Sequence, residues 1–157
     1  SYIEIENPQN QYQLGDTLWV SVKVPESFKD LSGIPCTIAT NELLLRLSPF
    51  YLVRTTDTIE YSSYTNYDLP FKKGSIKNSV FNLIKENDFY ICTFGFVLDN
   101  TSINSLEIDD NFYIYNEDSN ESYCGADAKC QYNYKGFFLP VNFSNNYNTK
   151  FSFIVLP

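Results

Sequence analysis

The four cysteines are the residues whose type and spacing point to the most definite chemistry. Cys124 and Cys130 enclose five residues, Gly-Ala-Asp-Ala-Lys, and this short span in a polar segment predicts a local disulfide across a turn. Cys36 and Cys92 would then either join two strands or stay free and buried, and the sequence leaves both alternatives open. A zinc site built from all four would usually need two close Cys-x-x-Cys pairs, which the chain lacks. Disulfides would indicate an oxidising compartment, consistent with export.

Histidine is missing from the chain altogether. Its absence excludes Ser-His-Asp and Cys-His catalysis and also metal sites with histidine ligands. Ser-Lys and carboxylate-only mechanisms remain in principle, and two carboxylates can support glycoside hydrolysis. The adjacent Asp109 and Asp110 would point to opposite faces of a strand, so they do not form such a pair. We therefore predict no catalytic residue, no cofactor and no enzymatic activity.

Acidic residues are concentrated between residues 86 and 128, a stretch that we call the acidic segment. It holds ten Asp and Glu residues and no Lys or Arg, while the rest of the chain has nine acidic and eleven basic residues. Carboxylates are hard oxygen ligands, which makes Asp109 and Asp118 the candidate ligands of a calcium ion. The EF-hand pattern is missing, because no glycine occupies the position of its sharp turn. We expect a solvated acidic face and no metal site.

Tyrosines in polar, turn-rich segments are the candidate ligand-binding residues. The chain has 13 Phe, 13 Tyr and one Trp, and most of these rings must fill the core. Aromatic faces outside a core stack on sugars and anchor protein partners. The residues that we expect to contact a ligand are Tyr61, Tyr64, Tyr67, Tyr132 and Tyr134.

The elements that must position these residues are mainly strands, and the clearest runs from residue 17 to Pro25. Its residues alternate with period two, which is typical of a strand with one buried face. Trp19, Ser21 and Lys23 lie on the outer face, and a turn at residues 14–16 precedes the strand. The buried face consists of Leu18, Val20, Val22 and Val24.

A second core strand is predicted at residues 89–98. Gly95 lies on its outer face and leaves room there for a close neighbour. The inner face consists of Tyr90, Cys92, Phe94, Phe96 and Leu98. Further strands are expected at residues 2–6, 36–40, 43–53 with a break at Pro49, 58–61, 112–115, 132–143 and 151–156.

One short helix is predicted at residues 75–87. Ile76, Val80, Leu83 and Ile84 have the i, i+4, i+7, i+8 spacing of a helix face. Together these patterns predict an all-β fold, a single antiparallel β-sandwich of the Ig-like or Greek-key type that occupies residues 1–157 as one domain.

The net charge of −8 argues against nucleic acid and against an anionic membrane surface as partners. The chain contains no apolar run long enough to span a membrane, no signal peptide and no methionine. We therefore expect that any targeting segment has been removed, and that contact with a membrane would depend on a removed lipid anchor.

The run from Asn7 to Ser21, N-P-x-x-x-Y-x-L-G-D-T-L-W-V-S, resembles the start of the mature part of uncharacterised surface lipoproteins from Bacteroidetes. In that family a β-rich domain follows a signal peptide and a lipid-anchored cysteine. The resemblance implies an extracytoplasmic location, at the cell surface or the periplasmic face of a bacterial outer membrane. We expect a non-enzymatic binding or assembly domain with a protein or glycan ligand. The alternative is a carbohydrate-active enzyme or glycan-binding module that uses acidic residues and surface tyrosines.

Overall fold

All regular structure in the described part of the chain is β-strand, which confirms the predicted all-β, sandwich-like fold. The computed structural model describes residues 2–29, 35–38, 41–46, 50–61, 68–77, 80–108, 111–115, 136–140, 142–143 and 149–157.

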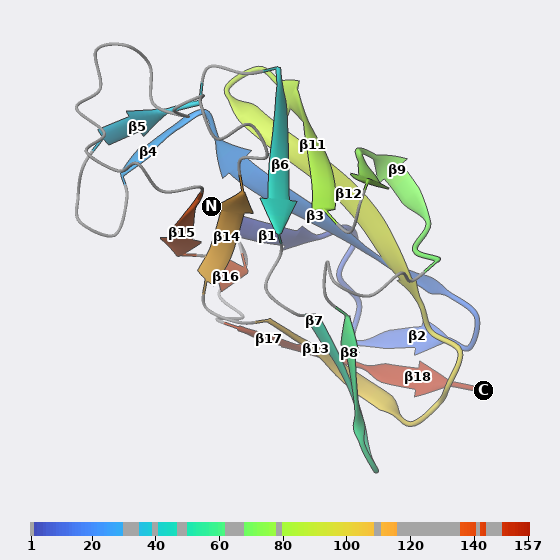
Figure 1. Ribbon diagram of the computed structural model, residues 1–157. Helices are drawn as coiled ribbons and strands as arrows, with labels where there is room; N and C mark the ends of the chain where they lie inside the picture. The colour runs from blue at the N-terminus through green and yellow to red at the C-terminus, as the bar shows by residue number, and fades with distance from the viewer. Residues whose placement is uncertain are drawn as a thin grey trace.

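The larger sheet contains ten strands in the order β15-β14-β6-β11-β12-β3-β1-β16, with β10 paired to β11 and β9 paired to β12 (Figure 1). Many neighbours in this sheet are far apart in sequence, and all pairs within it are antiparallel except β1 with β16. Its strands are β1 (Tyr2–Ile5), β3 (Thr17–Pro25), β6 (Glu42–Arg46), β9 (Phe71–Lys73), β10 (Ser75–Lys77), β11 (Val80–Glu86), β12 (Phe89–Val97), β14 (Asn111–Tyr115), β15 (Gly136–Pro140) and β16 (Asn142–Phe143).

A smaller antiparallel sheet contains four strands in the order β17-β13-β7-β8. Its strands are β7 (Phe50–Arg54), β8 (Thr58–Tyr61), β13 (Ile103–Ile108) and β17 (Lys150–Ser152). Two short pairs complete the fold: β2 (Gln11–Gln13) runs parallel to β18 (Ile154–Leu156), and β4 (Ser27–Lys29) runs antiparallel to β5 (Pro35–Thr37). Figure 1 shows β2 and β18 beside the C-terminus.

Strands β3 and β12 form the centre of the larger sheet and pair along their full length, from Phe89 opposite Pro25 to Val97 opposite Thr17. The predicted inner faces of both strands are confirmed, because every one of those side chains is at most 1% exposed. These residues are Leu18, Val20, Val22, Val24, Tyr90, Cys92, Phe94, Phe96 and Leu98.

The two sheets meet through aromatic rings. Phe50 of β7 contacts Phe94 edge-on, with ring centroids 5.4 Å apart, and also lies 5.8 Å from the ring of Phe96. Phe50, Phe94 and Phe96 belong to one cluster of buried residues that includes side chains from both sheets. Burial of a large aromatic side chain stabilises a fold by roughly 1.5–3 kcal/mol, so this aromatic contact contributes substantially to holding the sheets together.

The predicted turn at residues 14–16 is also confirmed, and it joins three parts of the chain. Gly15 has a φ of +91°, a backbone conformation that favours glycine. Its amide donates to the carbonyl of Leu98 at 2.8 Å, and the amide of Leu14 donates to the carbonyl of Leu156 at 2.7 Å. The Asp16 carboxylate accepts from the Gln13 amide at 2.8 Å. The turn thereby connects β12 to the C-terminal strand.

The predicted helix at residues 75–87 is wrong. Residues 75–77 and 80–86 are strands β10 and β11, which pair with each other, and β11 also pairs with β6 and β12. Phe81 and Leu83 are buried while Asn82 and Ile84 are more exposed, so the segment alternates as a strand does. Pairing on both sides satisfies the backbone hydrogen-bonding groups of β11. A short apolar run fits either a helix or a strand, and here the pairing with neighbouring strands determines that it is a strand. Asn87, expected to end the helix, has a φ of 53° in the turn between β11 and β12.

The other predicted strands agree with the structure more closely where their residues are described, while residues 39–40, 47–49, 132–135 and 141 lie outside the description. The strand predicted at residues 43–53 is two strands, β6 of the larger sheet and β7 of the smaller one. Strand β4, which begins at Ser27, was not predicted. Strand β13, which lies inside the acidic segment, was not predicted, although Leu106 and Ile108 are buried in it.

Candidate functional site

Most of the predicted site residues lie outside the part of the chain whose side chains the structure describes. For Cys36 and Tyr61 the strands β5 and β8 are described, but their side chains are not. The candidate disulfide, the calcium ligands and all five tyrosines therefore stay predictions. The residues outside the description are Tyr64, Tyr67, Asp109, Asp118, Cys124, Cys130, Tyr132 and Tyr134.

Cys92 is the one predicted site residue with a fully described environment. It carries a free thiol on the buried face of β12, and its sulfur donates to the carbonyl of Lys73 at 3.4 Å. Burial raises the pKa of this thiol to about 12. A thiol that is buried and protonated is a poor nucleophile and a poor metal ligand, so Cys92 acts as a small core residue.

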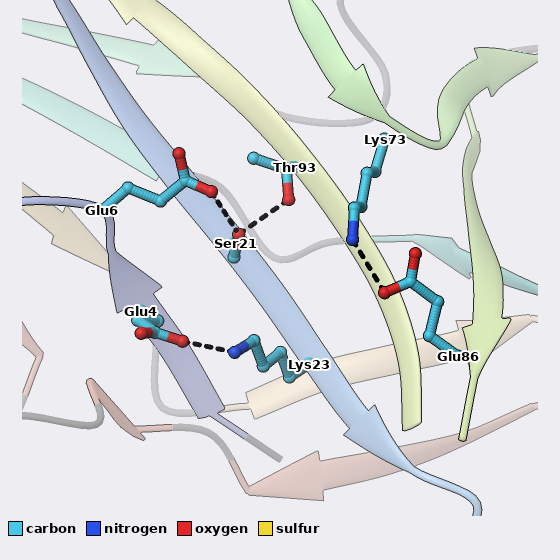
Figure 2. Close-up of polar contacts among 7 residues, drawn as sticks. All are labelled: Glu4, Glu6, Ser21, Lys23, Lys73, Glu86 and Thr93. Atoms are coloured by element: carbon cyan, nitrogen blue, oxygen red, sulfur yellow. Dashed lines mark hydrogen bonds and ion pairs between the residues drawn. The ribbon is translucent and has the colours of Figure 1, made fainter. Parts of the chain in front are cut away.

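The best-defined group of polar side chains lies on the outer face of the larger sheet, where β1, β3 and β12 are neighbours (Figure 2). Period two places Trp19, Ser21 and Lys23 of β3 on this face, as predicted. Thr93 of β12 lies opposite Ser21, and Gly95 lies opposite Trp19. The outer face therefore combines an aromatic ring, hydroxyl groups and charges.

Glycine at position 95 allows the indole of Trp19 to lie close to the neighbouring strand. A Cβ atom on Gly95 would lie 3.2 Å from Cε3 of Trp19 and only 2.3 Å from Cγ2 of Thr17. Both distances are shorter than an ordinary van der Waals contact, which confirms the predicted close neighbour of Gly95. The missing side chain leaves room for the indole beside β12.

Lys72 of β9 and Glu6, the residue that follows β1, complete the arrangement around the ring. The Lys72 ammonium lies over the Trp19 ring, 4.3 Å from its centroid, and pairs with Oε2 of Glu6 at 2.6 Å. The Ser21 hydroxyl donates to Oε1 of Glu6 at 3.4 Å and lies 2.7 Å from the hydroxyl of Thr93. We call Glu6, Trp19, Ser21, Lys72 and Thr93 the Trp19 cluster.

The members of the Trp19 cluster differ sharply in exposure. Ser21 and Thr93 are buried, with 4% and 2% of their surfaces exposed, whereas the side chains of Lys72 and Glu6 are 46% and 31% exposed. The two hydroxyls are therefore enclosed by the protein, and the Ser21 hydroxyl orients the Glu6 side chain. The ammonium of Lys72 and the carboxylate of Glu6 face solvent. An exposed ion pair of this kind contributes about 0–1 kcal/mol to stability, so Lys72 can leave at low cost.

Two further ion pairs lie on the same face (Figure 2). Lys23 pairs with Glu4, and this hydrogen bond raises the pKa of Lys23. Lys73 pairs with Glu86 at 2.7 Å. With Lys72 and Glu6, these pairs balance three lysines against three glutamates. The charges of these three pairs cancel one another, in a chain whose net charge is −8.

In the Trp19 cluster, the Ser21 hydroxyl is not placed for the serine-based chemistry that the sequence left open. The Ser21 hydroxyl is buried and bonded to Glu6 and Thr93, so a substrate cannot reach it. A Ser-Lys mechanism needs a lysine that contacts the serine. Lys72 instead binds the carboxylate of Glu6, 2.6 Å away.

Two carboxylates of the acidic segment are paired with lysines that lie outside it. Glu86 binds Lys73, and Glu107 of β13 binds Lys150 of β17 at 2.8 Å. Glu86 and Glu107, which belong to one acidic stretch of the sequence, therefore lie in different sheets, each beside a lysine. Where side chains are described, no three Cys, Asp or Glu residues converge in a way that could hold a metal ion.

Comparisons with known proteins add no relative: no protein-family model, curated protein or solved structure matches this chain. The resemblance of residues 7–21 to Bacteroidetes surface lipoproteins therefore stays a prediction. Within the described ranges, no helix is long and apolar enough to cross a membrane.

Sequence reasoning found part of this site and missed the rest. Alternation placed Trp19 and Ser21 on the outer face correctly, and Gly95 was recognised as a point of close approach. The role of Lys72 was not predicted, because its contact with Glu6 joins residues 66 positions apart. Nothing in a single sequence indicates which distant aromatic ring a lysine in a short strand will cover.

Proposed function

We propose that this protein is a non-enzymatic binding or assembly domain exposed outside the cytoplasm, in which the sandwich is a scaffold for ligand contacts. The observation that carries the proposal is the Trp19 cluster. It brings the aromatic ring of Trp19, on the central strand β3, together with a carboxylate that follows β1 and an ammonium from β9, beside a buried hydroxyl that bonds the carboxylate. Side chains whose orientation is fixed before binding lose little conformational entropy when a ligand arrives.

The composition of the outer face supports the same proposal. Tryptophan, tyrosine and phenylalanine are enriched in binding surfaces. Besides Trp19, this face carries Tyr2 and Phe89, whose rings are in edge contact with centroids 6.0 Å apart. Paired charges also cost less to desolvate than isolated charges, so these ion pairs oppose a contact that removes water from this face less than free charges would.

An extracytoplasmic location is part of the proposal and rests on the resemblance of residues 7–21 and on the predicted disulfide at Cys124 and Cys130. The proposed ligand is a protein or a glycan. A glycan-processing enzyme with two catalytic carboxylates is the outcome that would contradict the proposal.

Two parallel assays test the function. The purified domain is screened for binding against a panel of oligosaccharides, and its hydrolysis of chromogenic glycosides is compared with that of the heat-unfolded protein. We expect no hydrolysis above the unfolded control. Any saccharide that binds should bind less tightly to Trp19→Leu and equally well to Ile154→Ala, whose residue is 55% exposed in β18. Hydrolysis that is lost in a single carboxylate variant would overturn the proposal.

A further inference from the structure

The aromatic ring of the Trp19 cluster already carries a cation, and that cation belongs to the protein itself. The Lys72 ammonium lies 4.3 Å from the centroid of the ring and 2.6 Å from a carboxylate oxygen of Glu6. An ammonium above an indole, beside an anion, is the geometry in which aromatic residues recognise cationic groups. The structure thus shows that this position accepts a positive charge.

The remainder of the cluster does not depend on Lys72. The Trp19 ring is placed by its own strand and by the missing side chain of Gly95. Glu6 is oriented by the Ser21 hydroxyl, which is fixed in turn by Thr93. An aromatic surface with a carboxylate at its edge would therefore persist if the lysine moved away.

Lys72 is well placed to move. Its side chain is 46% exposed, and it extends from β9, a strand of three residues. By contrast, Trp19 and Ser21 belong to the nine-residue β3 at the centre of the sheet. Trp19 and Ser21 therefore lie at the centre of the sheet, whereas the ammonium of Lys72 extends from a short peripheral strand.

We propose that the Trp19 cluster is a receptor for a basic side chain, an arginine or lysine of a partner protein, and that Lys72 occupies this receptor in the free protein. The net charge of −8 favours a positively charged partner at long range. An arginine gains most from this site, because its planar guanidinium stacks on the indole and forms two hydrogen bonds with one carboxylate. A neutral sugar would leave the Glu6 carboxylate without the positive charge that it has beside it in the free protein.

This inference rests on the proposed binding function and names the chemistry of its ligand. The probe is a capped hexapeptide of alternating arginine and glycine, and its control has glutamine in place of arginine. Binding is followed by the fluorescence of Trp19, the one tryptophan of the chain. The titrations are made at about 0.15 M salt, where the long-range attraction between exposed charges is largely screened.

Lys72→Ala removes the internal competitor and should bind the arginine peptide about fivefold more tightly than the natural protein, from the energies of an exposed cation–π contact and ion pair. Lys73→Ala is the matched control. It removes the same charge from the adjacent residue, whose exposure of 43% is nearly equal, but Lys73 pairs with Glu86 and not with the cluster. We expect Lys73→Ala to bind as the natural protein does.

Glu6→Gln should weaken binding, and Glu86→Gln, the corresponding change in the neighbouring ion pair, should not. The melting temperature of each variant shows whether it is folded. Equal affinities of Lys72→Ala and Lys73→Ala would overturn the inference, because binding would then follow net charge alone. Absence of any fluorescence change with the arginine peptide would also overturn it. If the arginine peptide fails in either of these ways but a saccharide binds in the oligosaccharide screen, the proposed binding function is retained and only the cation receptor is excluded.

Discussion

Phe50 and Phe94 contact each other edge-on across the interface of the two sheets, with centroids 5.4 Å apart and ring planes at 86°. Phe50 is 1% exposed, and Phe94 is completely buried. Edge-to-face geometry brings the positive edge of one ring to the negative face of the other, which adds to the stabilisation from burial alone. The contact therefore stabilises the packing of β7 against β12.

Removing one of these rings should strongly destabilise the fold. For Phe50→Ala we expect a loss of about 3–5 kcal/mol in the free energy of unfolding, because a cavity remains between the sheets. Urea denaturation at equilibrium measures this change. The control is Leu14→Ala, at a residue that is 48% exposed, where the change should stay below about 0.5 kcal/mol. Equal losses in the two variants would show that Phe50 does not link the sheets.

The close approach at Gly95 predicts a specific rescue. Gly95→Ala places a methyl group 2.3 Å from Cγ2 of Thr17, and such overpacking typically costs about 1–3 kcal/mol. Thr17→Ser removes Cγ2, so the double variant should recover part of that loss. Unfolding free energies of the two single variants and the double variant form a double-mutant cycle. If the two effects simply add, Thr17 is not the obstacle.

The sequence predicted the centre of this fold well because β3 and β12 alternate cleanly and each buries one face. It failed at residues 75–87, where the spacing of Ile76, Val80, Leu83 and Ile84 fits a helix, yet pairing with β6 and β12 determines the structure. The outward position of Trp19 also followed from alternation. The contact of Lys72 with Glu6 did not, because it depends on how β9 and the end of β1 meet in three dimensions.

The disulfide between Cys124 and Cys130 can be tested directly. We expect peptide mapping without reductant to recover the two cysteines in one linked fragment, because they are separated by a short polar span around Gly125. Cys92 should appear unlinked in the same map, since its thiol is free. Complete labelling of both Cys124 and Cys130 by a thiol reagent, under native and non-reducing conditions, would contradict the prediction.

Calcium should act on the acidic segment only as a salt. A ligand that binds the folded state stabilises it by about 2.7 kcal/mol at about a hundredfold excess over its dissociation constant. Because Glu86 and Glu107 are paired with lysines, we expect millimolar calcium and sodium chloride of equal ionic strength to shift the melting temperature equally. A larger shift with calcium, abolished by Asp109→Ala or Asp118→Ala, would instead reveal a metal site.

The stability of the protein should fall in alkaline solution partly because of one thiol. Burial raises the pKa of Cys92 from its ordinary value of 9.0 to about 12, so the folded state keeps a proton that the unfolded state releases. The stabilisation is therefore fully present below pH 9 and is lost as the pH rises toward 12, at a rate that approaches about 1.4 kcal/mol per pH unit. Urea denaturation between pH 8 and pH 11, with Cys92→Ala as the comparison, measures this loss. Lysines and tyrosines titrate in both proteins, so their effects cancel in the difference between the two stability curves. The natural protein should lose stability faster than Cys92→Ala above pH 9, and parallel curves would mean that the Cys92 thiol ionises as readily in the folded state as in the unfolded one.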